Sequence, residues 1–283
     1  MNSRNIGLVI LLSLFLVGCF SIHFTESSVF SVVPPPDTLQ PPATLSPQHH
    51  FQAVTFETRD GYQLEGWWFT VSDTVPTVLF CGGDAFTLQS DESGVRILTQ
   101  LPVNVFAFNY RGYGHSTGHP TLAGIVRDGE AAYTLLRDSL AASTSPLYLL
   151  GHSLGSYVTV QLALHQSVAG LIVDAPITDV PDLYSHMRHQ FPWWWRVIGS
   201  VQIDSSVYAL NNMPYLPHLS CPTLVMARER DTLVPVSSAQ RFYAALPPAQ
   251  KHWTVIPDAT HNHLPAASVE NYVHTILQFI HAQ

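Results

Sequence analysis

The sequence predicts an α/β fold, with a mostly parallel central sheet, helices on both faces and a small cap insertion. Three observations lead to this prediction. Short apolar runs alternate along the chain with longer helical patterns, as in parallel sheets whose strands are connected by helices. The apolar runs contain few polar residues, as expected of strands that are buried on both faces. One long aromatic stretch interrupts the alternation between two strands, and this stretch predicts the cap.

The composition is that of a folded, acidic protein. Of its 283 residues, 46% are hydrophobic and 11% are charged, which is enough apolar material for one large domain and a tail. The formal net charge is −8, and Lys251 is the only lysine. Binding to a phosphate backbone requires clustered positive charge, so no nucleic-acid partner is expected.

The beginning of the chain is typical of an export signal. One positive charge precedes an apolar run from Ile6 to Val17, which is shorter than a membrane span of about 20 residues. The run ends in Gly18-Cys19, similar to the lipobox of bacterial lipoproteins. We therefore predict a signal peptide over 1–18 and lipidation of Cys19, which would anchor the protein in a membrane of the bacterial cell envelope, facing outside the cytoplasm. A longer signal-anchor helix is the alternative.

The predicted domain boundaries follow from the composition after Cys19. Residues 19–50 are rich in proline, serine, threonine and glutamine, which predicts an extended tether. The folded domain is expected over 51–283, with the cap at about 177–218. Cys81 and Cys221 would lie at opposite edges of a parallel sheet, so we predict that both are free thiols.

The elements of the domain are expected in the following order. An antiparallel pair is predicted over 51–57 and 62–70, with a turn at Asp60-Gly61. Buried parallel strands are predicted over 77–81, 103–110, 147–150, 168–174, 223–227 and 252–256. Helices are predicted over 121–138, 153–166, 237–246 and 268–281.

Two segments match the G-x-S-x-G pattern of a nucleophile elbow, one around Ser153 and one around Ser116. An elbow requires a strand directly before the serine and a helix directly after it. Ser153 has both, whereas Ser116 lies between a glycine-rich loop and Gly118-His119-Pro120. We therefore predict that Ser153 is the nucleophile.

A serine hydroxyl becomes an effective nucleophile only beside a base, and a histidine base is usually held by a carboxylate. Asp231 and His261 both follow predicted strands, at the edge where such sheets bind ligands. They are the predicted acid and base, with Asp174 as the alternative acid and His263 as the alternative base. Metal-ligand spacing such as H-E-x-x-H is absent from the sequence, so no metal or cofactor is expected.

Over about Phe51 to His281 the chain resembles the serine α/β hydrolases of the Bem46 and ABHD12/13/17-like group. The motifs that carry the resemblance are Asp60-Gly61, Gly66-Trp67-Trp68, Asn109-Tyr110-Arg111-Gly112-Tyr113-Gly114, Gly151 to Gly155, Asp231-Thr232-Leu233-Val234-Pro235 and His261-Asn262. The resemblance implies an α/β-hydrolase fold and an oxyanion hole formed by the backbone N–H groups of Gly83 and Leu154. The chain departs from the group in having Cys81-Gly82-Gly83-Asp84 where His-Gly-Asn is usual.

These residues predict a serine hydrolase that cleaves an ester, thioester or amide through an acyl-enzyme. Trp193, Trp194 and Trp195 in the cap are candidate pocket residues for an apolar acyl substrate, and packing of the cap is the other interpretation. Two further hypotheses stand beside this one. The first is a catalytically silent binding protein of the same fold, and the second is an aminopeptidase.

Overall fold

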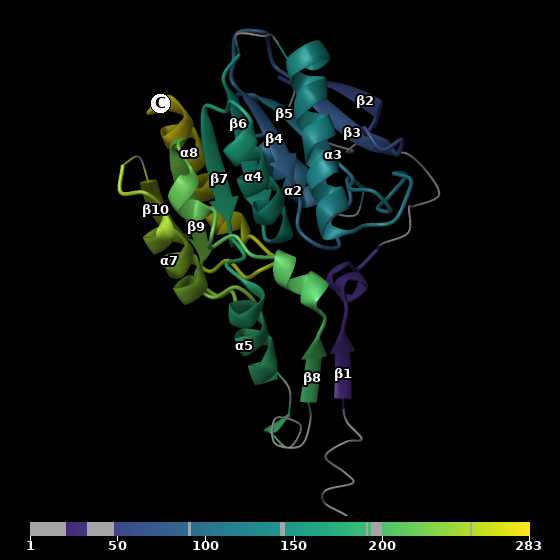
Figure 1. The fold of residues 1–283 in the computed structure, drawn as a ribbon. Helices are drawn as coiled ribbons and strands as arrows, with labels where there is room; N and C mark the ends of the chain where they lie inside the picture. The colour runs from purple at the N-terminus through teal and green to yellow at the C-terminus, as the bar shows by residue number, and fades with distance from the viewer. Residues whose placement is uncertain are drawn as a thin grey trace, which may run out of the picture.

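The computed structural model describes residues 21–32, 48–89, 92–141, 145–190, 192–193, 200–249 and 251–283. Its centre is an eight-stranded sheet with the strand order β10-β9-β7-β6-β4-β5-β3-β2 (Figure 1). The strands are β2 (His50–Glu57), β3 (Gln63–Thr70), β4 (Thr77–Cys81), β5 (Asn104–Phe108), β6 (Leu147–His152), β7 (Gly170–Asp174), β9 (Thr223–Arg228) and β10 (Lys251–Ile256). β3 is antiparallel to both of its neighbours, and all the other pairs are parallel.

Helices cover both faces of the sheet through two separate hydrophobic clusters. On one face, buried residues of α3 (Leu122–Leu135), α4 (Leu154–His165) and α7 (Val236–Ala245) belong to the larger cluster. On the other face, α2 (Glu92–Leu98) and α8 (Ala266–His281) contribute to the second cluster. The predicted fold class is therefore confirmed. The helix predicted over 121–138 is divided, because α3 passes into a π-helical turn, η2 (Leu136–Leu140).

The parallel arrangement determines where the functional loops meet. β4, β6, β7, β9 and β10 run in the same direction, so the segments that follow them emerge at one edge of the sheet. Ser153, Asp231 and His261 all lie just after strands of this group. Cys81 and Cys221 are free, as predicted.

The segment between β7 and β9 contains α5 (Val180–Gln190), β8 (Ser200–Ile203) and two 3₁₀ turns, η3 (Ser205–Ala209) and η4 (Leu216–His218). These elements lie over the edge of the sheet where the functional loops meet, and we refer to them as the cap. Its strand β8 projects away from the central sheet beside β1 (Ser21–Phe24), as Figure 1 shows.

The N-terminal segment departs from the expected tether. Residues 21–32, which the composition placed in the tether, form β1, a 3₁₀ turn η1 (Glu26–Val29) and a short extended end. Phe30 is buried in the larger hydrophobic cluster. β1 pairs with β8, and its apolar residues Ile22 and Phe24 lie at every second position, on one face of the strand.

The predicted signal peptide over 1–18, the lipidation residue Cys19 and residues 33–47 of the tether lie outside the described residues. Within the described ranges, no helix has both the length and the apolar character needed to cross a membrane.

Candidate active site

Ser153 lies at a sharp turn between β6 and α4. Its backbone has φ 51° and ψ −115°, a conformation that residues other than glycine rarely adopt. The turn brings the start of α4 close to β4, and the glycine at position 155 makes this approach possible. A Cβ there would overlap the Cys81 carbonyl oxygen of β4. The strained turn leaves the Ser153 hydroxyl at the edge of the sheet, where it faces the loops after β9 and β10.

His261 and Asp231 lie in line with the Ser153 hydroxyl. The Nε2 atom of His261 is 2.9 Å from Ser153 Oγ, and its Nδ1 atom is 2.7 Å from Asp231 Oδ2. A carboxylate only accepts hydrogen bonds, so Nδ1–H donates to Asp231. Nε2 is then left with a lone pair that faces the serine hydroxyl, which is the arrangement that general-base catalysis requires.

The carboxylate of Asp231 is itself held in place by the loop that carries it. Its Oδ1 atom accepts hydrogen bonds from the backbone N–H groups of Leu233 at 2.9 Å and Val234 at 2.8 Å. Oδ2 is thereby directed at His261. The side chain of Asp231 is fully buried and that of His261 is 12% exposed, so little water competes for the contact between them.

The alternative acid, Asp174, has a different partner. Arg228 donates to both of its oxygens, from Nε at 3.0 Å and from Nη2 at 2.6 Å. Burial alone would raise the pKa of Asp174, but the charge and hydrogen bonds of Arg228 together with the nearby His152 outweigh it and hold the pKa well below its usual range. Arg228 also donates to the carbonyl oxygen of His261 at 2.7 Å. Asp174 is therefore linked to the loop of His261 and not to its imidazole.

The alternative base, His263, is exposed, and its carbonyl oxygen accepts a hydrogen bond from Thr260 N–H. Of the two candidate bases, the structure brings only His261 to Ser153.

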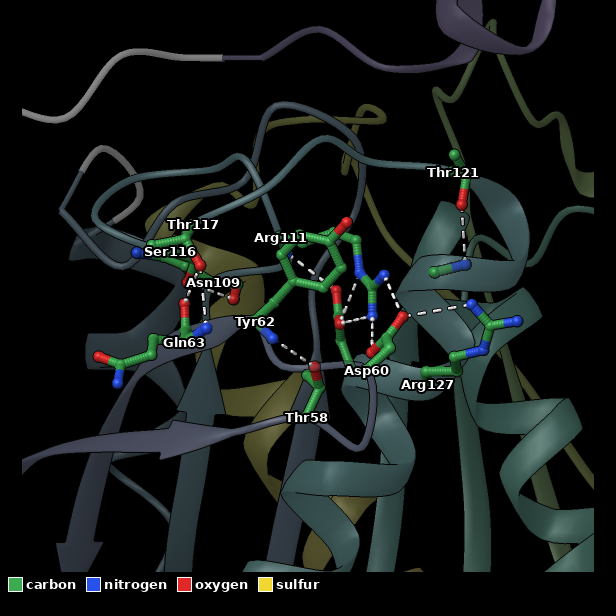
Figure 2. Close-up of polar contacts among 12 residues, drawn as sticks. Thr58, Asp60, Tyr62, Gln63, Asn109, Arg111, Ser116, Thr117, Thr121 and Arg127 are labelled. Atoms are coloured by element: carbon green, nitrogen blue, oxygen red, sulfur yellow. Dashed lines mark hydrogen bonds and ion pairs between the residues drawn. The ribbon is translucent and has the colours of Figure 1, made fainter.

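Ser116, the other serine in a G-x-S-x-G pattern, is engaged in backbone contacts. Its buried hydroxyl donates to the Asn109 carbonyl oxygen at 2.8 Å (Figure 2). It also accepts from the Glu65 N–H at 3.0 Å. In the same loop, Arg111 donates to Asp60 at 2.8 Å and lies over the ring of Tyr62 (Figure 2). These contacts fix the loop, so the second pattern has a structural explanation.

Gly83, one of the two residues expected at an oxyanion hole, lies beside the elbow. A Cβ at Gly83 would be 3.3 Å from Ser153 Cβ, and Leu154 begins α4 directly after the serine. The neighbouring Asp84, whose charge the sequence places near the hole, already has two donors. Its Oδ1 atom accepts from Tyr113 Oη and from Ser31 N–H, each at 2.7 Å.

Two cavities meet at Ser153. A cleft of about 610 Å³ contains the polar side chains of Asp174, Arg228 and His261, for which we call it the polar cleft, although Phe86, Ile97 and Leu264 also line it. A second cavity of about 280 Å³ lies between the cap and the N-terminal segment and is lined almost entirely by apolar side chains.

Trp193, the candidate pocket tryptophan that the structure describes, is not found at either cavity. Trp193 is 71% exposed and lines neither of them, whereas Trp194 and Trp195 lie outside the described residues. The apolar cavity is lined by other cap residues instead, among them Leu183, Tyr184 and Met187. The helical spacing of these three along α5 was the signal available in the sequence.

Across the described part of the chain, no three His, Cys, Asp or Glu side chains are grouped as metal ligands would be.

His152, the residue before Ser153, has a pKa that burial lowers, and the charge of Arg228 lowers it further. Its Nδ1 atom lies 3.4 Å from Asp174 Oδ2 without hydrogen-bond geometry. Its ring centroid is 5.2 Å from that of His261. A positive charge on His152 would therefore oppose the positive charge that His261 gains as a base.

We expect the neutral state of His152 to make folding stability depend on pH. The unfolded chain takes up a proton here near pH 6.5, whereas the folded chain resists protonation because the pKa of His152 is lowered. This contribution to the free energy of unfolding is present above about pH 6.5 and is lost as the pH falls below it. Urea unfolding of His152→Asn should show a smaller fall in stability between about pH 7.5 and 5.5. The exposed His119 provides the control, His119→Asn, which should keep the fall seen in the parent protein. An equal fall in parent and His152→Asn would show that folded His152 binds the proton freely.

The sequence is similar to a family described as serine aminopeptidase S33, which matches residues 75–214. The protein bem46 of Schizosaccharomyces pombe is 26% identical over 220 residues, covering 75% of this chain and 71% of its own length. Lysophosphatidylserine lipase ABHD12 of Xenopus tropicalis is 26% identical over 215 residues, covering 71% of this chain. The chain spans 55% of the length of that lipase.

Among solved structures, the esterase Pf2001 of Pyrococcus furiosus superposes with a TM-score of 0.68. The superposition covers 89% of this chain and 98% of the esterase, at 20% sequence identity. At this identity the likeness concerns the fold.

Proposed function

We propose that this chain, a member of the α/β hydrolases of the Bem46/ABHD group, is a serine hydrolase with Ser153, His261 and Asp231 as its catalytic residues. The single observation that carries the proposal is the line of two short contacts, from Ser153 Oγ to His261 Nε2 and from His261 Nδ1 to Asp231 Oδ2. These three side chains come from loops after three different strands, which all end at the same edge of the sheet.

The proposed reaction is acyl transfer to water. Nε2 of His261 takes the hydroxyl proton as Ser153 Oγ forms a bond with the carbonyl carbon of the substrate. The resulting oxyanion accepts hydrogen bonds from the backbone N–H groups of Gly83 and Leu154. When the bond to the leaving group breaks, His261 returns the proton to that group. A water molecule then attacks the acyl-enzyme by the same route, which releases the acid and restores Ser153.

Asp231 orients the imidazole of His261 and stabilises its charged form during both steps. Its two backbone donors, on Leu233 and Val234, keep the carboxylate in place throughout. In this scheme Oδ1 of Asp84 has no free lone pair to direct at the oxyanion, because Tyr113 and Ser31 both donate hydrogen bonds to that atom.

The proposed substrate is an ester with an apolar acyl group. The apolar cavity of about 280 Å³ reaches Ser153 and Leu154, so an acyl chain bound there has its carbonyl end at the nucleophile. The predicted lipidation of Cys19 would hold the enzyme at a membrane of the cell envelope, where acylated molecules are abundant.

An aminopeptidase is the second candidate, because the matching family is described as serine aminopeptidase. Hydrolysis of aminoacyl amides in preference to acyl esters would favour this candidate. A silent binding protein would hydrolyse neither.

Labelling with a fluorophosphonate probe tests the proposal, since the probe reacts only with an activated serine. We expect the full-length protein in detergent to be labelled on Ser153, as identified by mass spectrometry of the labelled peptide. Ser116→Ala should be labelled to the same extent. A folded protein that remains unlabelled would contradict the proposed activity.

A further inference from the structure

The apolar cavity beside Ser153 is built from two parts of the chain that are distant in sequence. The cap contributes α5, β8 and η3, and the N-terminal segment contributes β1 and η1. At its inner end the cavity reaches Ser153, Leu154 and Leu233. An occupant of the cavity would therefore contact residues 22–31 along one side and the nucleophile at its end.

The two-stranded ribbon of β1 and β8 presents an apolar face to this cavity. The strands are parallel, with Ile22 opposite Val201 and Phe24 opposite Ile203. All four side chains line the cavity. The intervening positions, His23 and Gln202 among them, do not line it, as expected because side chains alternate between the faces of a strand.

The ribbon is held by polar contacts that do not involve its apolar face. The Phe24 carbonyl oxygen accepts from Asp204 N–H at 3.0 Å, and His23 Nε2 is 2.7 Å from Asp204 Oδ1. Further along, Glu26 Oε1 accepts from the N–H of Leu122, the first residue of α3, at 2.7 Å. These contacts fix the segment against both the cap and the body of the domain. The position of the N-terminal segment is thus fixed by hydrogen bonds at several residues along its length.

The apolar face of the ribbon is only partly covered by protein. Ile22 is 40% exposed, although it faces a cavity lined by other apolar side chains. Exposure of apolar surface to water is unfavourable by about 25 cal/mol per Å². An apolar ligand that fills the cavity would remove this exposure. A partly open apolar cavity beside the proposed nucleophile therefore favours the binding of an apolar group.

The same segment ends beside the proposed oxyanion hole. Ser31, two residues after the end of η1, donates its N–H to Asp84, the residue that follows Gly83. Ser31, Asp84, Ser153 and Leu233 line both the apolar cavity and the polar cleft. The boundary between the two cavities is therefore at the nucleophile, with an apolar side for an acyl chain and a polar side for a leaving group.

We propose that residues 21–32 form one wall of an acyl-binding pocket and that this wall makes the enzyme select esters with a long aliphatic acyl chain. The inference rests on the proposed function and deepens it by naming the element that recognises the substrate. A long chain contacts the ribbon along Ile22 and Val201, whereas an acetyl group is too short to leave the surroundings of Ser153. Selectivity for the long chain is thus a property of the ribbon and not of the catalytic residues.

The test compares a charge on the two faces of the same strand. Val201→Glu places a carboxylate in the cavity, and the control Gln202→Glu places one on the opposite face at the next position. Full-length proteins in detergent are assayed with p-nitrophenyl acetate and p-nitrophenyl decanoate. For Val201→Glu we expect kcat/KM on the decanoate to fall by about 10- to 100-fold, because the charge must be desolvated or the chain excluded. Activity of Val201→Glu on the acetate and of Gln202→Glu on both esters should stay within about twofold of the parent.

A second measurement keeps the inference separate from the proposed activity. Binding of a fatty acid with an environment-sensitive fluorophore to Ser153→Ala reports on the pocket without turnover. Adding Val201→Glu to this protein should weaken binding at least about 10-fold, and adding Gln202→Glu should not. If the parent hydrolyses neither ester while this binding difference remains, the proposed activity fails and the acyl pocket stands. Equal losses on both esters, an unchanged preference for decanoate, or equal binding by the two variants would overturn the pocket.

Discussion

Replacement of Ser153 by alanine is expected to lower kcat/KM for an activated acyl ester by about 10⁴- to 10⁶-fold. The Ser153 hydroxyl forms the bond to the acyl carbon in the proposed reaction. Among the described residues, no other nucleophilic side chain contacts His261 Nε2. The fold should not change, because the substitution removes one hydroxyl at a residue whose backbone is held by Asp174 and Ser156. Hydrolysis of a p-nitrophenyl ester and thermal unfolding measure the two effects.

Ser116→Ala is the matched control for this prediction, because Ser116 lies in the other G-x-S-x-G segment. It should leave kcat/KM nearly unchanged and lower the free energy of unfolding. The loss should be about 1–3 kcal/mol, since the buried Glu65 N–H and Asn109 carbonyl lose their partner. Retention of activity in Ser153→Ala with loss in Ser116→Ala would contradict our assignment of the nucleophile.

Asp231→Asn is expected to lower kcat by about 10⁴-fold, or about 5.5 kcal/mol of transition-state stabilisation. The asparagine preserves the shape of the side chain, but its amide can donate to Nδ1 and so favour the tautomer of His261 with the proton on Nε2. In that tautomer the imidazole cannot accept the proton of Ser153. Steady-state kinetics at saturating ester measure the change.

Asp174→Asn provides the comparison, because Asp174 is the alternative acid of the sequence. It should chiefly affect stability, with a loss of about 3–5 kcal/mol, since Arg228 would remain in a buried site without its counter-charge. Urea unfolding measures this loss. The assignment of the acid would be reversed if Asp174→Asn lost the larger share of kcat in protein that remains folded.

Local patterns in the sequence predicted most of the fold. Strands buried on both faces must be apolar along their whole length, so β4, β6, β7 and β9 stand out, and their predicted ends lie within about two residues of the observed ones. The helix α2 was missed, because it has only seven residues and two short turns give little periodic signal. The β1–β8 ribbon was missed for a related reason. Each of its strands has four residues, and each depends on the other for its hydrogen bonds.

In the candidate site, too, some residues could be identified from local sequence and others only from the tertiary structure. The flanks of Ser153 distinguish it from Ser116 in the sequence itself, because a strand before and a helix after are local properties. The choice between Asp231 and Asp174 is not local. Both follow strands at the same edge of the sheet, and only the position of Arg228 on the neighbouring strand shows which carboxylate is already paired.

By itself, the sequence determined the class of fold, the strands of the central sheet and the elbow serine, because strand and helix periodicity and turn geometry depend on neighbouring residues. The tertiary structure alone decided which carboxylate faces His261, that Trp193 lines neither cavity, and that residues 21–32 lie beside Ser153. These features depend on contacts between residues that are 30 to 179 positions apart, such as Asp231 with His261 and Ser21 with Ser200. Such contacts leave no periodic pattern in a single chain.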